Sequence, residues 1–233
     1  MVTETFRWRG GWARIAPWPG PERGVAHLTV GSDTPPSCEV VEHCLTRLRH
    51  AGYGGVVTNA LTAADSLPFV DAGFAVRERL HLLEHDLTGL REPLRPTRRA
   101  RRGDRPGVLA LDHRAFEPSW RLAGATGLDE ALRATRVARM RVAAANGAAP
   151  VAYAITGRAG DQGYLQRVAV DPDARRAGWG RALVADGLHW LRRRGSRRAL
   201  VNTQLGNDAA LSLYEASGFR RLPVGLCVLA RPL

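Results

Sequence analysis

The stretch LQRVAVDPDARRAGWGRALV, residues 165–184, decides how this sequence is interpreted. It reads as a strand that ends at Val170, a turn at Asp171-Pro172, and an arginine- and glycine-rich loop that leads directly into an amphipathic helix. Such a loop presents unpaired backbone N–H groups at the positive end of the helix dipole. Because glycines occupy positions 178 and 180, a phosphate can approach the backbone closely. The stretch therefore predicts a pyrophosphate site, and three arginines can add charge-assisted hydrogen bonds to it: Arg175, Arg176 and Arg181.

Two other phosphate-binding loops do not fit this stretch. The dinucleotide pattern G-x-G-x-x-G is absent because Ala182-Leu183 follow where the third glycine is needed. The pattern G-x-x-x-x-G-K-[ST] is excluded because the chain has no lysine, so that all 34 of its basic residues are arginines. A Gly-x-Gly helix start on its own is also a common structural turn, and the surrounding sequence must therefore support the assignment.

The segments around the loop predict an α+β fold with a mainly antiparallel start and one crossover helix. Hydrophobic periodicity indicates helices over residues 104–116, 128–135, 178–194 and 207–217. Strand-like runs cover residues 139–145, 151–156, 164–170, 199–204, 219–222 and 226–230. Asn146-Gly147 separates the first two runs and is a strong hairpin signal.

The order of these motifs resembles the GNAT superfamily of acetyl-CoA-dependent N-acetyltransferases. The similar elements are the strand, Asp-Pro, R-x-x-G-x-G, the helix, a strand with Asn202, and NDAALSLYEASGF from residue 207. The resemblance covers roughly residues 94–233 and implies the GNAT acyl-CoA acyltransferase fold, a mixed, mostly antiparallel sheet flanked by helices. It also implies a transferase that uses acetyl-CoA as co-substrate and a primary amine as acceptor, and no metal is expected. Because the sequence has no apolar run long enough for a membrane span and no signal-peptide core in residues 1–20, a cytoplasmic protein is expected.

The resemblance also assigns roles to individual residues. The loop holds the pyrophosphate of coenzyme A, the preceding strand splays from its neighbour to pair with the pantetheine arm, and Asn207 contacts that arm. Tyr214 is the general acid, because the departing thiolate benefits from a phenol proton, and an amide near Val168 stabilises the oxyanion. Asn207 is equally a good N-cap, and Tyr214 equally a core aromatic. The implied cofactor-binding residues are Val168, Ala169, Val170, Arg175, Arg176, Ala177, Gly178, Trp179, Gly180, Arg181, Ala182, Asn202 and Asn207.

One departure from the family pattern concerns the general base. Many members place a glutamate on the strand before the loop, whereas residues 162–170 contain no carboxylate. Alternation along a strand predicts Tyr164, Gln166 and Val168 on one face. The base is therefore unassigned, and proton removal must use ordered water or a residue elsewhere. Four side chains in the acceptor-side helices are weak candidates that read more readily as surface or capping groups: Asp112, His113, Glu117 and Asp129.

A proline-, glycine- and arginine-rich segment, residues 91–107, predicts a boundary near Leu90. Residues 1–90 then form a smaller domain and residues 94–233 the catalytic one. The smaller domain carries a degenerate repeat of the larger one, because GYGGVVTNAL and FVDAGF (residues 52–74) align with GSRRALVNTQL and YEASGF (residues 195–219). In this alignment Thr62 stands for Asn207 and Phe69 for Tyr214.

The N-terminal copy is expected to bind no cofactor. Its loop at residues 30–37 has no R-x-x-G-x-G, and two prolines delete amides that a pyrophosphate would need. This resembles tandem GNAT proteins with one vestigial half, here reduced to the second half of a domain that supports the catalytic one or walls its acceptor cleft.

Composition sets the remaining expectations. The formal charge is +12, but an arginine-only basic set fits compositional bias, so a nucleic-acid partner is not expected. No apolar run approaches the roughly 18 residues of a membrane span. Histidines 81 and 85 fall in a predicted strand, where a helical metal spacing does not apply, and tryptophans 8, 12 and 18 fit an amphipathic strand pair. The acceptor and the oligomeric state, monomer or homodimer, stay open, and the alternative function is a non-catalytic acyl-CoA-responsive or nucleic-acid-binding module.

Overall fold

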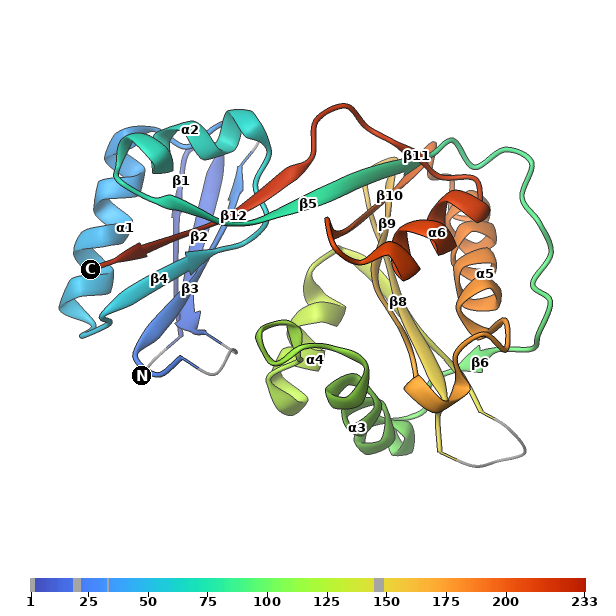
Figure 1. Cartoon of the computed structure of the whole chain (residues 1–233). Helices are drawn as coiled ribbons and strands as arrows, with labels where there is room; N and C mark the ends of the chain where they lie inside the picture. Colours follow the sequence, from blue (N-terminus) through green and yellow to red (C-terminus); the bar gives the residue numbers. More distant parts are fainter. Residues whose placement is uncertain (1–2, 19–21, 33, 145–148) are drawn as a thin grey trace. The chain divides into compact units, whose positions relative to one another are not determined.

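The structure is a computed structural model that describes residues 3–18, 22–32, 34–144 and 149–233. The chain forms two compact units (Figure 1). The first comprises Met1–Leu82, Asn202–Gly206 and Leu222–Leu233, and the second comprises Leu83–Val201 and Asn207–Arg221. The chain therefore returns to the first unit twice after leaving it. Within the described ranges, no helix combines the length and apolar character needed to cross a membrane.

The second unit is built on a mixed sheet. Its strands are β6 (Arg98–Arg99), β7 (Val137–Ala143), β8 (Ala152–Ala159), β9 (Gln162–Val170) and the first part of β10 (Arg198–Gln204). Strands β6 to β9 pair antiparallel in sequence order, and β9 pairs parallel with β10. The short strand β11 (Arg220–Arg221) pairs with the end of β5 (Ala75–His85). The predicted antiparallel start and single parallel crossover are confirmed.

Four helices flank this sheet: α3 (Arg105–Ala115), α4 (Gly124–Arg133), α5 (Trp179–Arg193) and α6 (Asp208–Ala216). Helix α5 crosses from β9 to β10 and buries the predicted stripe of Leu183, Leu188 and Leu191, while arginines in its last turn suit the negative end of the helix dipole. Helices α3 and α4 pack with β7, β8 and β9 in a separate cluster around Leu111 and Leu128. The predicted Asn146-Gly147 turn lies outside the described residues.

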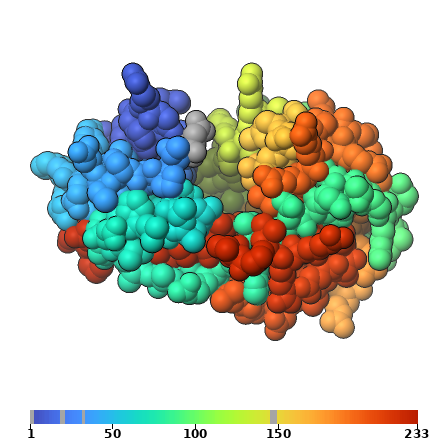
Figure 2. All heavy atoms as spheres, turned by 90° about the horizontal axis from the view of Figure 1, so that it is seen from above, coloured from blue at the N-terminus to red at the C-terminus, as the bar shows by residue number. Residues whose placement is uncertain are grey.

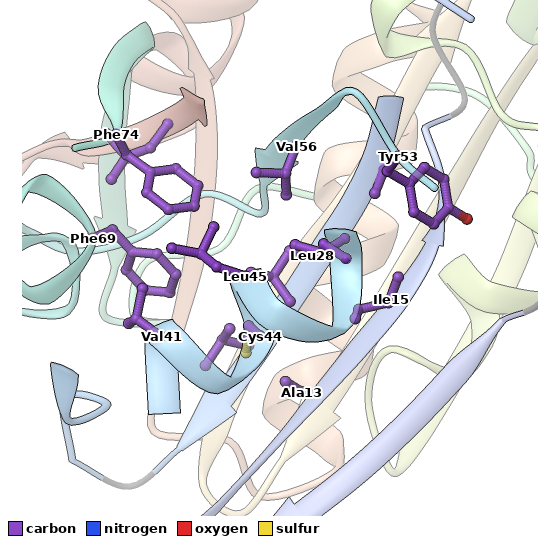
Figure 3. Packing of buried hydrophobic residues seen from close by; sticks show 14 of the residues in the cluster. Ala13, Ile15, Leu28, Val41, Cys44, Leu45, Tyr53, Val56, Phe69 and Phe74 are labelled. Carbon is purple, nitrogen blue, oxygen red and sulfur yellow. The ribbon is translucent and has the colours of Figure 1, made fainter. Parts of the chain in front are cut away.

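The strands of the first unit follow the order β1-β2-β3-β4-β12-β5. Besides β5, its strands are β1 (Glu4–Trp8), β2 (Gly11–Pro17), β3 (Val25–Ser32), β4 (Gly55–Thr58) and β12 (Leu226–Pro232). Helices α1 (Cys38–His50) and α2 (Ala63–Asp71) supply side chains such as Leu45 and Phe69 to a core that includes Ile15 and Leu28 (Figure 3). The predicted pairing of the tryptophan-bearing strands β1 and β2 is confirmed.

The C-terminal strand β12 belongs to the first unit rather than to the unit that precedes it in the chain. It lies antiparallel between β4 and β5. Leu229 is fully buried, and its amide donates to Thr58 Oγ1 at 3.0 Å. The first unit is therefore completed by residues more than 130 positions beyond its last helix, α2. Local sequence patterns do not reveal that the C-terminal strand belongs to this unit.

The internal repeat is visible in the backbone. The order β3-α1-β4-α2 matches β9-α5-β10-α6, with parallel pairing in both cases. Gly52 and Gly195 both have φ +76°, and Gly73 and Gly218 have φ +82° and +95°. Edge-to-face ring pairs also correspond, because Phe69–Phe74 centroids lie 5.2 Å apart and Tyr214–Phe219 centroids 5.7 Å apart.

The expected reduction of the N-terminal copy to half a domain needs correction. Strands β1 and β2 precede β3 in an antiparallel order, as β7 and β8 precede β9. In the part of the first unit that the structure describes, no helix precedes β3. The copy thus retains counterparts of most of the sheet and lacks counterparts of α3 and α4.

Candidate cofactor and acyl-transfer site

The predicted phosphate loop joins β9 to α5 in a conformation that requires glycine at its end. A 3₁₀ turn (Pro172–Ala174) follows Val170, Arg176 has φ +64°, and Gly178 is the N-cap of α5 with φ +84°. A Cβ placed on Gly178 would meet only Arg95 Nε, at 3.8 Å, so the space in front of the helix is open. Only glycine adopts this left-handed backbone without steric cost.

The loop offers a row of free amides. Within the described residues, no backbone N–H from residue 176 to residue 181 donates to another group of the protein. The amide of Ala182 donates to Gly178 O at 3.0 Å, so this row ends at Arg181 and the predicted contribution of the Ala182 amide is not available. Unpaired amides at a helix N-terminus favour an anion, and this region therefore fits a phosphate-bearing ligand.

The apolar residues at both ends of the loop pack against the protein, whereas the arginine side chains of the loop are exposed to solvent. Trp179 and Val170 pack with Leu183, and a Cβ on Gly180 would approach Leu213 Cδ2 to 3.1 Å, so this glycine permits close packing against α6. The side chains of Arg175, Arg176 and Arg181 are exposed. Arg114 pairs with Asp171 before the turn, and this hydrogen-bonded contact lowers the pKa of that carboxyl. The arginines are thus available to an anion at the amide row.

Strand β9 separates from β10 before it reaches the loop. The parallel ladder joins residues 162–164 of β9 to residues 198–200 of β10 and goes no further within the described strands, although β9 continues to Val170. On that edge, the predicted residues Val168, Ala169 and Val170 lie beyond the end of the ladder. An unpaired strand edge can form hydrogen bonds with an extended ligand.

A β-bulge interrupts β9 and corrects one expectation. Thr156 of β8 pairs with Leu165 and Ile155 pairs with Arg167, which leaves Gln166 as the extra residue. Because the bulge shifts the alternation, Val168 packs with the α5 clusters whereas Arg167 bonds to Asp112 of α3. Tyr164, Gln166 and Val168 therefore do not share one face. Gln166 Oε1 is buried and has no hydrogen-bond partner among the described residues.

Tyr214 lies on α6 in the cluster that also contains Leu165 and Val184, and Val168 packs against this cluster. Its ring contacts Phe219 edge-to-face, and Phe219 contacts His85 in the same way at 5.2 Å. The ring is 6% exposed, and burial raises the pKa of the phenol. The hydroxyl is therefore protonated at neutral pH, the state that a proton donor needs.

The two predicted asparagines lie in different surroundings. Asn207 caps α6, and its Oδ1 accepts from the Ala210 amide at 3.1 Å, which confirms the capping role. Asn202 is exposed on β10, in the short stretch that belongs to the first unit. The structure thus groups the loop, β9 and Tyr214 in the second unit and leaves Asn202 outside it.

A buried polar cluster that sequence reasoning missed lies on the α3 side of β9. Asp112 is fully buried and accepts hydrogen bonds from Arg167 Nε at 2.6 Å, from the Tyr153 hydroxyl, and from the Leu122 amide at 2.8 Å. Arg167 also donates to Trp120 O at 2.6 Å and lies 3.9 Å from the centre of the Phe116 ring. The cluster holds residues 116–122 beside the sheet. The sequence feature that could have indicated this cluster is the position of Asp112 on the apolar face of α3, four residues after Val108.

The other candidate bases are not gathered at the loop either. Asp129 pairs with Arg105, and Asp112 is committed to Arg167. His113 and Glu117 are exposed. None of these side chains hydrogen-bonds to β9 except Asp112, among the contacts of the described residues. The general base stays unassigned.

Comparison with known proteins agrees with this geometry. Residues 107–219 match the acetyltransferase (GNAT) family. A tandem GNAT protein from the clavulanic acid biosynthesis pathway has a TM-score of 0.69 at 14% identity, covering 96% of this chain and 79% of its own. A GCN5-related N-acetyltransferase from Kribbella flavida has a TM-score of 0.65 at 16% identity, covering 100% and 90%. At these identities the likeness concerns the fold.

Curated relatives match shorter segments. The [ribosomal protein bS18]-alanine N-acetyltransferase of Escherichia coli K12 is 38% identical over 73 residues, which are 31% of this chain and 49% of the relative. The mycothiol acetyltransferase of Geodermatophilus obscurus is 48% identical over 59 residues, 25% of this chain and 19% of the relative. The matches thus span about half or less of these proteins. The family match over residues 107–219 shows that this chain contains a domain of the acetyltransferase (GNAT) family, and a tandem GNAT protein is among the structures that share its fold.

Proposed function

We propose that the second unit is an acetyl-CoA-dependent N-acetyltransferase that acts on a primary amine, of a small molecule or a protein N-terminus, by direct attack in a ternary complex. The observation that carries the proposal is the row of free amides at residues 176–181, which follows the part of β9 that is not paired with β10. Tyr214 packs in the buried cluster that also contains Leu165 of β9 and Val184 of α5. These groups match the three parts of an acyl-CoA: the amide row the diphosphate, the unpaired edge of β9 the extended pantetheine arm, and Tyr214 the sulfur.

Each group has a defined task in the proposed reaction. The amides of residues 176–181 and the exposed arginines hold the diphosphate, and the free edge of β9 orients the arm. The amine nitrogen attacks the thioester carbonyl, a C–N bond forms, and an amide of β9 near Val168 stabilises the negative oxygen. The C–S bond then breaks and the Tyr214 hydroxyl gives its proton to the sulfur. The nitrogen loses a proton to ordered water, and this proton restores the Tyr214 hydroxyl, so that the amide and the thiol of coenzyme A are the products.

The acceptor is expected to enter from the side of α3 and α4. Arg167 bonds to Asp112 of α3, and Gln166 Oε1 and Thr135 Oγ1, just after α4, both lie beside the position a Cβ would take on Gly157. The Gln166 oxygen is buried and has no hydrogen-bond partner among the described residues. An amine could donate a hydrogen bond to this oxygen. One relative is named for a ribosomal-protein alanine and another for mycothiol. Because these names point to different acceptors, the proposal keeps the acceptor class at primary amines.

We propose further that the first unit binds no acetyl-CoA and supports the second. Its counterpart of the phosphate loop contains Pro35 and Pro36 and leads into α1 through a Ser37 N-cap whose oxygen accepts from the Val40 amide. Phe69 replaces the phenol of Tyr214. These features supply neither the amide row nor the acid.

The test is thiol release from acetyl-CoA by the purified full chain, measured over a panel of primary amines and N-terminal peptides, with an amine-free reaction as control. Amine-dependent release with a matching acetylated product supports the proposal. No release above the control for any amine, together with binding of acetyl-CoA, favours a non-catalytic acyl-CoA-responsive module.

A second candidate function rests on charge. The second unit contains 25 arginines and 14 acidic residues, whereas the first contains 9 and 8. Nearly all of the excess positive charge therefore lies in one unit, as in a protein that binds polyanions. RNA or DNA binding whose affinity falls steeply with salt, in a protein without transferase activity, would favour this function.

A further inference from the structure

The segment between β5 and β6, residues 86–97 of the second unit, brings an arginine to the phosphate loop. The Arg95 guanidinium carbon lies 4.6 Å from the centre of the Trp179 ring, at the first residue of α5. Its Nε lies 3.8 Å from the position a Cβ would take on Gly178. Among the described residues, Arg95 therefore supplies the one heavy atom within 4 Å of that position, beside the start of the amide row. Figure 2 shows this segment, in green, on the surface beside the orange spheres of α5.

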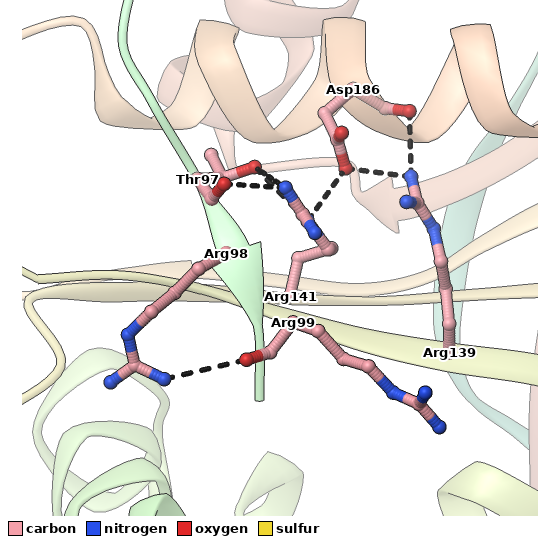
Figure 4. Close-up of polar contacts among 6 residues, drawn as sticks. All are labelled: Thr97, Arg98, Arg99, Arg139, Arg141 and Asp186. Atoms are coloured by element: carbon pink, nitrogen blue, oxygen red, sulfur yellow. Dashed lines mark hydrogen bonds and ion pairs between the residues drawn. The ribbon is translucent and has the colours of Figure 1, made fainter. Parts of the chain in front are cut away.

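This segment is fastened on both sides of Arg95. Before it, His189 Nε2 of α5 lies 3.1 Å from Arg91 O, which it can reach as a donor. After it, Arg141 of β7 donates to Thr97 O and to Thr97 Oγ1, and its Nε lies 3.3 Å from Asp186 (Figure 4). Pro93 and Pro96 further restrict the backbone. The position of Arg95 therefore follows from fixed anchors and does not depend on a free loop.

Arg95 has its charge available for a ligand. The side chain is exposed, and within the described residues it forms no ion pair or hydrogen bond. Stacking on an indole holds the plane of a guanidinium while its N–H groups stay free for a phosphate. A planar fork that is held beside unpaired amides forms a more complete anion site than the amides alone.

We infer that Arg95 is a further phosphate-binding residue of the acetyl-CoA site, contributed by the segment between β5 and β6 of the second unit. The inference rests on the proposed function. Arg95 would bind a phosphate of a coenzyme A thioester, either the diphosphate or the 3′-phosphate. It would thereby favour coenzyme A over acyl thioesters that lack phosphates.

The test is calorimetric titration of coenzyme A and of pantetheine into the full chain and its Arg95→Ala variant. Loss of one charge-assisted hydrogen bond is expected to weaken coenzyme A binding about tenfold, with pantetheine binding unchanged. Arg99→Ala is the matched control, because it removes the same charge from an exposed side chain of β6 without contact to the loop. Both variants should melt at the temperature of the wild type.

The outcomes separate the inference from the proposed function. Equal affinities for coenzyme A in Arg95→Ala and Arg99→Ala overturn the role of Arg95 and leave the proposed function intact. A wild-type chain that binds no coenzyme A overturns both. Dephospho-coenzyme A identifies the contact, since a tenfold effect that persists with it assigns Arg95 to the diphosphate and one that disappears assigns it to the 3′-phosphate.

Discussion

Replacement of Asp112 by alanine tests how the acceptor side of the second unit is held together. The carboxylate is fully buried and accepts three hydrogen bonds. Among the described residues its ion-pair partner is Arg167, whose side chain is 13% exposed. Removing one member of a buried ion pair leaves the other without its counter-charge and costs about 3–5 kcal/mol. We therefore expect Asp112→Ala to lower the free energy of unfolding of the second unit by about 4 kcal/mol.

Urea unfolding followed by circular dichroism measures this loss, with the double variant Asp112→Ala/Arg167→Met as comparison. The double variant removes both charges and should be more stable than Asp112→Ala alone. The milder substitution Asp112→Asn keeps an acceptor for the Leu122 amide but removes the charge, so residues 116–122 should be held less firmly. We expect the KM for the amine to rise and the affinity for coenzyme A to change less than twofold. A cost below about 1 kcal/mol for Asp112→Ala, or additive effects in the double variant, would refute the reasoning.

Three further predictions follow from other contacts. Tyr214→Phe should lower turnover about 10²-fold or more, the usual contribution of a positioned acid, with coenzyme A affinity nearly unchanged in calorimetry; unchanged turnover removes the acid assignment. Leu229→Ala should destabilise the first unit by about 2–5 kcal/mol, which thermal unfolding of the full chain can measure, and a loss confined to the second unit would contradict the placement of β12. The hydrogen bonds from Arg98 hold the pKa of Asp104 at about 2, so the stability they give is present above the unfolded pKa and is lost as the pH falls through about 2; urea unfolding between pH 5 and 2 should show this step in the wild type and not in Asp104→Asn.

Local patterns predicted most of the second unit. The apolar stripe of α5, the Asn207 cap of α6 and the glycines at 178 and 218 depend on residues close in sequence, and the structure places them as periodicity and capping rules require. The sequence also predicted the equivalence of the two copies, and the structure agrees because glycines at matching positions share the same backbone conformation.

The features that sequence could not reveal depend on contacts between distant residues. The placement of β12 in the first unit depends on contacts between distant residues, such as the hydrogen bond from the Leu229 amide to Thr58 Oγ1. The bulge at Gln166 comes from the register of β8 against β9, and no composition signal marks it. From the sequence, Asp112 is interpreted as a surface or capping group, because its buried partner Arg167 is 55 positions away and their contact cannot be inferred from local patterns. Arg95 lies in the proline-, glycine- and arginine-rich segment, residues 91–107, whose composition predicts only a domain boundary.

Calorimetric titration of coenzyme A into the wild type, Gly178→Ala and Gly178→Glu tests the central claim, that the start of α5 is a diphosphate site. Both substitutions strain the same left-handed residue, but only glutamate places a negative charge at the amide row. We expect the wild type to bind, and Gly178→Glu to bind at least about tenfold more weakly than Gly178→Ala, as expected from like-charge repulsion of more than 1.4 kcal/mol. Equal affinities in the two variants, or no binding by the wild type, would contradict it.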